Sequence, residues 1–292
     1  MVKILSLLLY KLLKFCDFLL KFLNRSSIIY NLNKLIRHNS YIEKNLNNKK
    51  IKFFVPNLLT LKRTNKILIK EPNTLQWIDQ FKVQNDEEIV FWDIGSNIGL
   101  FSIYACSKHR NIKVYSFEPS FNNLVILSRN ITINNLSKKI LICQFPLSKY
   151  QNQILSFKES QFEEGTSLNV FNENFDFEGK KISLDNEYKI FGTTIDFLTE
   201  KKIINLPHFI KIDVDGIEHL VLEGSIETLK NPKIKSIMIE INFNFKEQKE
   251  KSFKILETCG FKFIEKSNSS MSGKNSDKFS NSYNCIFEKK KS

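Results

Sequence analysis

From residue 89 onward, short apolar runs alternate with longer stretches whose apolar residues recur at helical spacing. The runs have the length of strands and lie at 89–93, 112–117, 140–145, 208–214 and 234–242. The helical patterns lie at about 98–108, 121–134, 193–202 and 216–230. Strands that alternate with helices predict an α/β fold with a parallel sheet covered on both faces.

The last part of the chain departs from this alternation. A helix is predicted at about 247–258, with Gly260 as its C-cap. Two β-prone runs follow, "FKFIEK" and "YNCIFE", separated by a Ser/Asn/Gly-rich spacer that predicts a loop. Two strands joined without a helix pair in antiparallel fashion. We therefore expect a mostly parallel sheet that closes with a C-terminal antiparallel hairpin.

The segment before the alternating part is divided by its polarity. Residues 51–70 contain two apolar runs around "PNLLT", which predict an antiparallel pair of strands, and 71–82 reads as a helix. The polar residues 26–50 are typical of a linker or short helices. The expected divisions are therefore a first helix and linker (1–50), a hairpin and helix (51–88) and a core domain (89–292).

Residues 1–25 are strongly apolar but interrupted by polar side chains, mostly at steps of three or four. This spacing predicts a basic amphipathic helix with a wide apolar face. No uncharged run approaches the roughly 20 residues that a membrane span needs, and no small-residue cleavage site follows. The helix could lie on a membrane surface or a partner, dock on the protein's own core, or act as an uncleaved signal anchor.

Composition bounds the chemistry only loosely. Lys and Arg number 44 against 31 acidic residues, a formal charge of +13. The lysines are scattered, which is typical of solvated faces and of a codon bias. Binding of an anionic lipid or an acidic substrate is the alternative. The usual nucleic-acid-binding spacings are absent, so we expect no nucleic acid as a partner. The five dispersed cysteines offer no metal-ligand spacing and fit a reducing, cytoplasmic setting, with a peripheral membrane location left open.

The first strand ends in a turn, "DIGSNIG", that opens a helix. Strand, glycine turn and helix in this order form a ligand-binding device, and only 9 glycines occur in the chain. The candidate binding residues of the turn are Asp93, Gly95, Ser96, Asn97 and Gly99. The alternative is a simple turn in which Asp93 caps the helix.

An acidic residue follows the second strand of the alternating part. Glu118, before Pro119, stands 25 positions after Asp93, close to the offset at which an acid reaches a ribose diol. The turn is not G-x-G-x-x-G, and two carboxylates disfavour a phosphate-rich ligand. They favour a nucleoside with a cationic part, such as an adenosyl sulfonium.

Two later strands carry further polar residues toward the same edge of the sheet. Lys211 and Asp213 point to one face of their strand, and a lysine in a buried strand needs a charged partner. Asp213 and Glu240 are the available partners. We favour a functional role for Lys211 and Asp213, and a purely internal ion pair is the alternative.

The helix after Asp213 offers two more candidates. Asp215 and Glu218 have the spacing of a capping box, which favours a structural role. His219 lies in the first turn of that helix and is the most suitable histidine for proton abstraction near neutral pH, although a lone helical histidine is more often structural.

Several of these segments together resemble the FkbM-type methyltransferases. They are "FWDIGSNIGLF", "VYSFEPSFNNL", "GTSL" and "FIKIDVDGIEHLVLEG", supported by "EPNTLQWID", "TTIDFL" and "IMIEIN". Any one motif is weak, but their order is specific over about residues 71–287. The resemblance implies a Rossmann-like seven-stranded sheet and a methyltransferase domain over 89–292.

The resemblance also implies a function. It implies transfer of a methyl group from S-adenosylmethionine to a hydroxyl of a sugar or natural-product scaffold. By it, the glycine turn lines the methionine end of the cofactor, Glu118 holds the ribose, Asp213 lies near the methyl group and Ser167 lies at the mouth. Asp215 departs from the family, where many members carry Glu.

Some questions stay open at this stage. Lys211, Asp213 or His219 could orient or deprotonate the hydroxyl, and Glu240 is a candidate for acceptor binding. The sequence shows no metal-ligand cluster, so metal dependence is undecided. The rival functions are a nicotinamide-dependent oxidoreductase and a non-catalytic, membrane-attached glycan-binding protein on the same fold.

Overall fold

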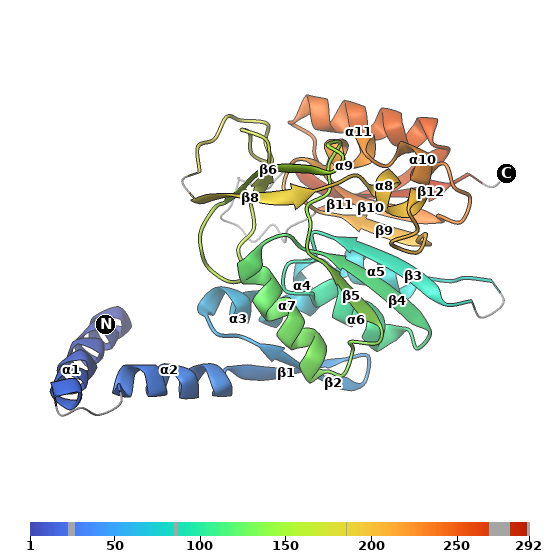
Figure 1. The fold of residues 1–292 in the computed structure, drawn as a ribbon. Helices are drawn as coiled ribbons and strands as arrows, with labels where there is room; N and C mark the ends of the chain where they lie inside the picture. Colours follow the sequence, from blue (N-terminus) through green and yellow to red (C-terminus); the bar gives the residue numbers. More distant parts are fainter. Residues whose placement is uncertain (23–26, 85–86, 185, 269–280, 291–292) are drawn as a thin grey trace.

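The structure is a computed structural model that describes residues 1–22, 27–84, 87–184, 186–268 and 281–290. Seven strands form the central sheet in the order β11-β12-β10-β9-β3-β4-β5 (Figure 1). Their bounds are β3 Ile89–Ile94, β4 Ile112–Phe117, β5 Ile140–Cys143, β9 Phe209–Ile212, β10 Ser236–Asn242, β11 Phe261–Asn268 and β12 Ser282–Lys289. Neighbours from β10 to β5 run parallel, whereas β12 is antiparallel to both β10 and β11. The predicted fold is confirmed; the Ser/Asn/Gly-rich loop between β11 and β12 lies mostly outside the described residues.

Helices cover both faces of this sheet, each over its own core. One face carries α5 Pro72–Asp79, α6 Leu100–Lys108 and α7 Phe121–Ile133. The other carries α8 Ile195–Glu200, α9 Glu218–Glu223, α10 Ile226–Leu229 and α11 Lys246–Thr258. Along β3, Phe91 packs into the first core and Trp92 into the second, because successive side chains of a strand point to opposite faces. A continuous apolar run is therefore what a central strand requires.

The segment that the sequence leaves irregular, 146–195, contains a second sheet. Its strands are β6 Gln153–Glu159, β7 Val170–Phe171 and β8 Asn186–Gly192, in the antiparallel order β7-β6-β8. Asn186, Glu187 and Lys189 of β8 are exposed or half-buried, which is why the strand has a weak apolar signal. A small core around Phe157, Phe171 and Ile217 joins this sheet to the main body.

The predicted hairpin at 51–70 is wrong in position. The antiparallel pair is β1 Tyr41–Leu46 with β2 Lys49–Phe54, and two helices follow, α3 Leu58–Asn65 and α4 Ile67–Lys70. The physical reason lies in "PNLLT": Asn57 and Thr60 form a reciprocal capping box, so this segment begins a helix instead of turning a hairpin.

The predicted helix at 216–230 is broken in two. Helix α9 ends at Glu223 and α10 begins at Ile226, with Gly224 between them. A Cβ atom at Gly224 would stand 2.2 Å from the carbonyl oxygen of Ser148. The predicted helix is therefore interrupted at Gly224, because the backbone of the loop after β5 approaches closely there.

The chain begins with α1 Val2–Phe22 and α2 Ile28–Asn39, which lie at the edge of the body in Figure 1. Only four residues of α1 are half-buried or buried: Leu13, Cys16, Asp17 and Leu20. The helix therefore packs against α2. It does not lie on the cores, although the self-docking alternative required that contact. No helix in the described part of the chain is long and apolar enough to span a bilayer.

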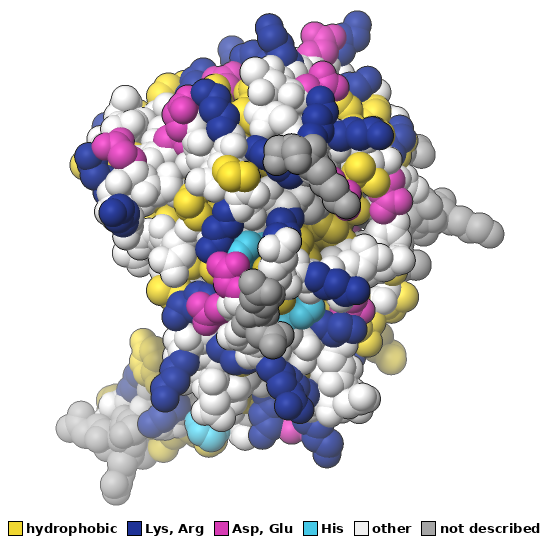
Figure 2. All heavy atoms as spheres, turned by 90° about the vertical axis from the view of Figure 1, so that its right-hand side faces the viewer, with side chains coloured by type: hydrophobic (Ala, Val, Ile, Leu, Met, Phe, Trp, Pro, Cys, Tyr) yellow, Lys and Arg dark blue, Asp and Glu magenta, His cyan; other side chains and the backbone are white. Residues whose placement is uncertain are grey.

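Charged side chains are spread over the surface. Figure 2 shows Lys and Arg side chains from one end of the visible face to the other, with acidic side chains among them. This distribution agrees with scattered, solvated lysines. All five cysteines are free, and Cys106 and Cys143 are buried in the cores as small apolar side chains.

Candidate active site

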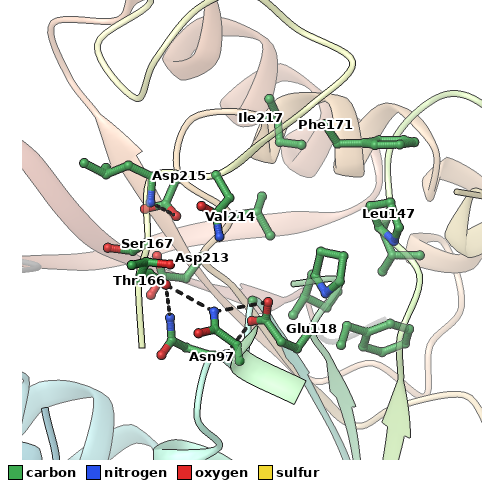
Figure 3. Close-up of a pocket in the computed structure, with 18 of the residues that line it drawn as sticks. Asn97, Glu118, Leu147, Thr166, Ser167, Phe171, Asp213, Val214, Asp215 and Ile217 are labelled. Atoms are coloured by element: carbon green, nitrogen blue, oxygen red, sulfur yellow. Dashed lines mark hydrogen bonds between the residues drawn. The ribbon is translucent and has the colours of Figure 1, made fainter. Parts of the chain in front are cut away.

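A cavity of about 310 Å³ lies beyond the carboxyl ends of β3, β4 and β9 (Figure 3). It is where a doubly wound sheet binds its ligand. The sequence-predicted residues that line it are Gly95, Asn97, Glu118, Pro119, Ser167, Asp213 and Glu240. Five other predicted residues do not line it: Asp93, Ser96, Gly99, Lys211 and His219.

The glycine turn fits closely between its neighbours. Gly95 has a φ of 83°, and a Cβ atom there would stand 1.8 Å from the carbonyl oxygen of Asp213. Gly99 is the N-cap of α6 with a φ of 84°, and a Cβ atom would stand 2.5 Å from a methyl group of Leu127. Only glycine permits these conformations at these contacts, so both residues position the floor of the cavity.

Asn97 and Glu118 connect the turn to the next strand end. Glu118 accepts hydrogen bonds from the backbone N–H groups of Asn97 (2.8 Å) and Ser120 (2.9 Å). The side chain of Asn97 donates to the carbonyl oxygen of Thr166 at 2.7 Å, as Figure 3 shows. Burial raises the pKa of Glu118 to about 7, although the N–H groups oppose this. A buried carboxylate is thus held at the cavity wall in a fixed orientation.

Asp93 lies beneath the cavity. Its side chain is fully buried and accepts a hydrogen bond from the Ser102 hydroxyl of α6 at 2.6 Å. Asp93 is still within β3, so its side chain faces α6 and does not reach the cavity lining where the sequence places it. Asp93 Oδ1 and Ser96 Oγ are buried without hydrogen-bond partners among the described residues. Burial raises the pKa of Asp93, and the nearby Lys211 ammonium lowers it.

Lys211 forms the ion pair that its strand position predicts. Its Nζ atom lies 2.7 Å from Asp213 Oδ2 and 4.9 Å from the ring centre of Phe101. Burial lowers the pKa of Lys211, but the charges of Asp213 and Asp93 outweigh this and the net shift is upward. Burial likewise raises the pKa of Asp213, and the ammonium outweighs it to give about 2. Lys211 is therefore a fixed cation behind the cavity and is unsuited to accept a proton.

Three carboxyl groups that the sequence leaves separate come together at this point. Single oxygens of Asp213, Glu218 and Glu240 lie within 4.8 Å of one another. Glu218 is already bonded to the N–H groups of Val214 and Gly216, and Lys211 neutralises Asp213. Two of the three carboxyl groups are thus compensated by donors of the protein itself.

The predicted capping box of Asp215 and Glu218 does not form. The N-cap of α9 is Ile217 and receives no side-chain hydrogen bond, because Asp215 adopts a φ of 59° and turns into the cavity. There Asp215 Oδ2 accepts from the Leu168 N–H at 2.7 Å. Burial and then the charge of Asp213 raise the pKa of Asp215 to about 6. Sequence reasoning missed this group because its spacing also fits a cap.

His219 is poorly placed for proton abstraction. The side chain is buried between Phe175 and Phe245 and is absent from the cavity lining. Burial lowers its pKa to about 4. The structural reading of this histidine fits the geometry better.

The remaining walls come mostly from segments without a clear sequence motif, although Phe117 directly precedes Glu118 at the end of β4. The apolar walls are Phe117, Phe145, Pro146, Leu147, Phe157 and Phe171, and the cations at the lining are Arg63 and Lys70. Several belong to the irregular middle segment or to α3 and α4, so no strand-end rule could have found them.

Comparison with known proteins agrees with the motifs. Residues 93–263, more than half of the chain, match the methyltransferase FkbM domain. The chain belongs to the FkbM methyltransferase family. One curated relative, a hexuronic acid methyltransferase of Haloferax volcanii, is 27% identical over 158 residues. That match covers 54% of this chain and 57% of the relative, so it spans little more than half of either protein.

Solved structures give weaker likenesses. An FkbM methyltransferase of Methylobacillus flagellatus has 13% identity and a TM-score of 0.42, covering 80% of this chain and 62% of that one. A second structure, M. capricolum TrmK in complex with S-adenosyl-homocysteine, has 14% identity and a TM-score of 0.40, covering 74% of this chain and 68% of that one.

Proposed function

We propose that the protein transfers a methyl group from S-adenosylmethionine to a hydroxyl group of a sugar. The observation that carries this is a cavity at the strand ends in which the FkbM glycine turn, Glu118 and Asp213 meet. A nicotinamide cofactor fits less well, because the turn lacks the G-x-G-x-x-G spacing for a diphosphate.

The cavity suits the parts of this cofactor. Glu118 is a buried acceptor for ribose hydroxyls, and Pro119 follows it in the wall. Phe117, Phe145 and Leu147 offer apolar surface for adenine. Gly95 lines the cavity, so the methionine end would lie against the glycine turn, above the buried Asp93. When bound, the cofactor supplies an activated methyl group on a sulfonium.

The chain's own residues then orient the acceptor and take its proton. Asp213, held by Lys211, is ionised and can accept a hydrogen bond from the acceptor hydroxyl. Asp215 has a pKa of about 6 and lines the same cavity, so it is the better general base. Ser167 and Glu240 provide further polar groups for sugar hydroxyls. A divalent cation at Asp213 and Glu240 is not needed for these roles.

The Arg63 guanidinium supports an acidic sugar as the class of methyl acceptor. Arg63 lines the cavity and, among the described residues, forms no ion pair; its Nε donates to the Gly165 carbonyl at 2.5 Å. Lys70, by contrast, is paired with Glu71 at 3.0 Å. A sugar carboxylate would find a partner at Arg63, and the curated relative is a hexuronic acid methyltransferase. We therefore propose an acidic sugar as acceptor.

Calorimetry and mass spectrometry test the function together. Titration should show binding of S-adenosylhomocysteine and none of NADH, and surface-polysaccharide sugars should gain a methyl group only when the protein is present. Asp213→Asn should keep cofactor affinity within about threefold but lower turnover roughly a hundredfold, because it removes acceptor orientation. Glu43→Gln, an exposed carboxylate on β1, is the control and should change neither. Tight NADH binding without S-adenosylhomocysteine binding would refute the proposal.

A further inference from the structure

Helix α1 presents a continuous apolar face to solvent. Its large side chains recur at alternating steps of three and four residues, and each is 45–81% exposed. These side chains are Leu5, Leu8, Leu12, Phe15, Leu19 and Phe22. We call this set the α1 apolar face. A face of this extent on a soluble protein marks a surface for a partner or a membrane.

The contact with α2 leaves the α1 apolar face open. Asp17, on another side of the helix, is buried against α2 and accepts from the Ser27 hydroxyl at 2.6 Å and the Ile29 N–H at 3.3 Å. Lys21 pairs with the same carboxylate at 3.0 Å. These bonds fix which side of α1 meets α2, and that side is not the apolar one.

The charges of α1 decide between the possible occupants. Lys3, Lys11, Lys14 and Lys21 stand against one acid, Asp17, which is already bonded. In a coiled coil of two copies, lysines would flank both apolar seams without acidic partners, and they would repel. An anionic lipid surface supplies the opposite charge and accepts an apolar face of this width.

We propose that α1 binds the surface of an anionic lipid bilayer, with its apolar face inserted and its lysines at the headgroups. This site is separate from the cavity and does not rest on the proposed function. Helix α2 links the two, because Arg37 pairs with Glu164 at 3.1 Å and Glu164 also bonds Asn57.

Co-sedimentation of the full chain with vesicles tests this. Binding is expected to vesicles of phosphatidylcholine with one-quarter phosphatidylglycerol, and to be at least about tenfold weaker to phosphatidylcholine alone. Leu8→Gln with Phe15→Gln should weaken binding at least about a hundredfold, because two apolar side chains lose their burial. The matched control is Leu7→Gln, four residues from both Lys3 and Lys11 and 54% exposed, which should stay within about threefold.

Three outcomes would overturn the proposal. They are no sedimentation with the charged vesicles, equal binding to neutral ones, and equal weakening by Leu7→Gln. Sedimentation velocity without lipid adds a fourth: a stable dimer that Leu8→Gln with Phe15→Gln dissociates would assign the face to a second copy. Equal thermal unfolding midpoints for all variants establish that they are folded.

Discussion

At the scale of single residues, burial decides what each carboxylate can do. Asp213 is ionised because Lys211 lies 2.7 Å away, whereas burial raises the pKa values of Glu118 and Asp215. The sequence identifies Glu118 and Asp213 as site residues by their places at strand ends. It cannot tell Asp93 from them, although Asp93 lies inside β3, in register with Lys211 and two residues before the strand-end position of Asp213, where its side chain is buried beneath the cavity.

Glu118 should make cofactor affinity depend on pH. Its carboxyl group has a pKa raised from 4.5 to about 7, so the neutral form dominates below pH 7. The negative charge that accepts hydrogen bonds from the ribose hydroxyls is then lost. The dissociation constant of S-adenosylhomocysteine should rise roughly tenfold from pH 8 to pH 6, measured by calorimetry. Glu118→Gln should bind weakly with a flat profile, and Asp215→Asn should retain the slope. A flat wild-type profile would contradict the assignment.

Asp215 should control the acidic limb of turnover. With a pKa raised to about 6, it loses its basic form as the pH falls, so kcat should drop about tenfold per unit below pH 6. Asp215→Asn should lower kcat by about 10²–10⁴ and remove this limb, measured as a pH–rate profile under saturating cofactor. His219→Gln is the comparison, and it should keep the limb. If that variant loses the limb instead, the base is wrongly assigned.

At the scale of elements, the sequence predicts strands and helices well where the pattern is strong. The run 89–94 is apolar throughout because both faces of β3 are buried. The pattern fails where local chemistry competes with it. Asn57 starts a helix in a run that reads as a strand, and β6 and β8 carry too many polar residues to give a strand signal. The segment 146–195 supplies much of the cavity wall, and within it the sequence pointed only to Ser167, so most of the proposed acceptor site was not predicted.

The turn after β3 should tolerate no side chain. Gly95→Ala would force a φ of 83° and a clash with the Asp213 carbonyl, so it should lower the free energy of unfolding by at least about 3 kcal/mol and abolish cofactor binding. Gly260→Ala is the matched control: its φ is 85°, but the nearest atom is 3.8 Å from the added Cβ. It should cost only about 1 kcal/mol and leave binding intact. Urea denaturation and calorimetry measure both; equal costs would contradict the clash.

At the scale of the whole molecule, the body and the first helix are energetically separate. Among the described residues the main contacts of α1 are with α2, and no apolar side chain of α1 belongs to a buried core. Removal of residues 1–22 should therefore shift the thermal unfolding midpoint of the body by no more than about 2 °C in calorimetry. A shift above about 5 °C would mean that α1 stabilises the body after all.

The contact between Gly95 and the Asp213 carbonyl has an evolutionary consequence. In the proposed function the loop at Gly95 holds the cofactor and the loop at Asp213 orients the acceptor, and the backbones of the two loops are in close contact. Drift in either loop disturbs both halves of the chemistry, so selection for new acceptors has little freedom there. Diversification among relatives should instead fall in the small sheet of β6, β7 and β8, where a changed side chain alters one wall and leaves the methyl-transfer apparatus untouched.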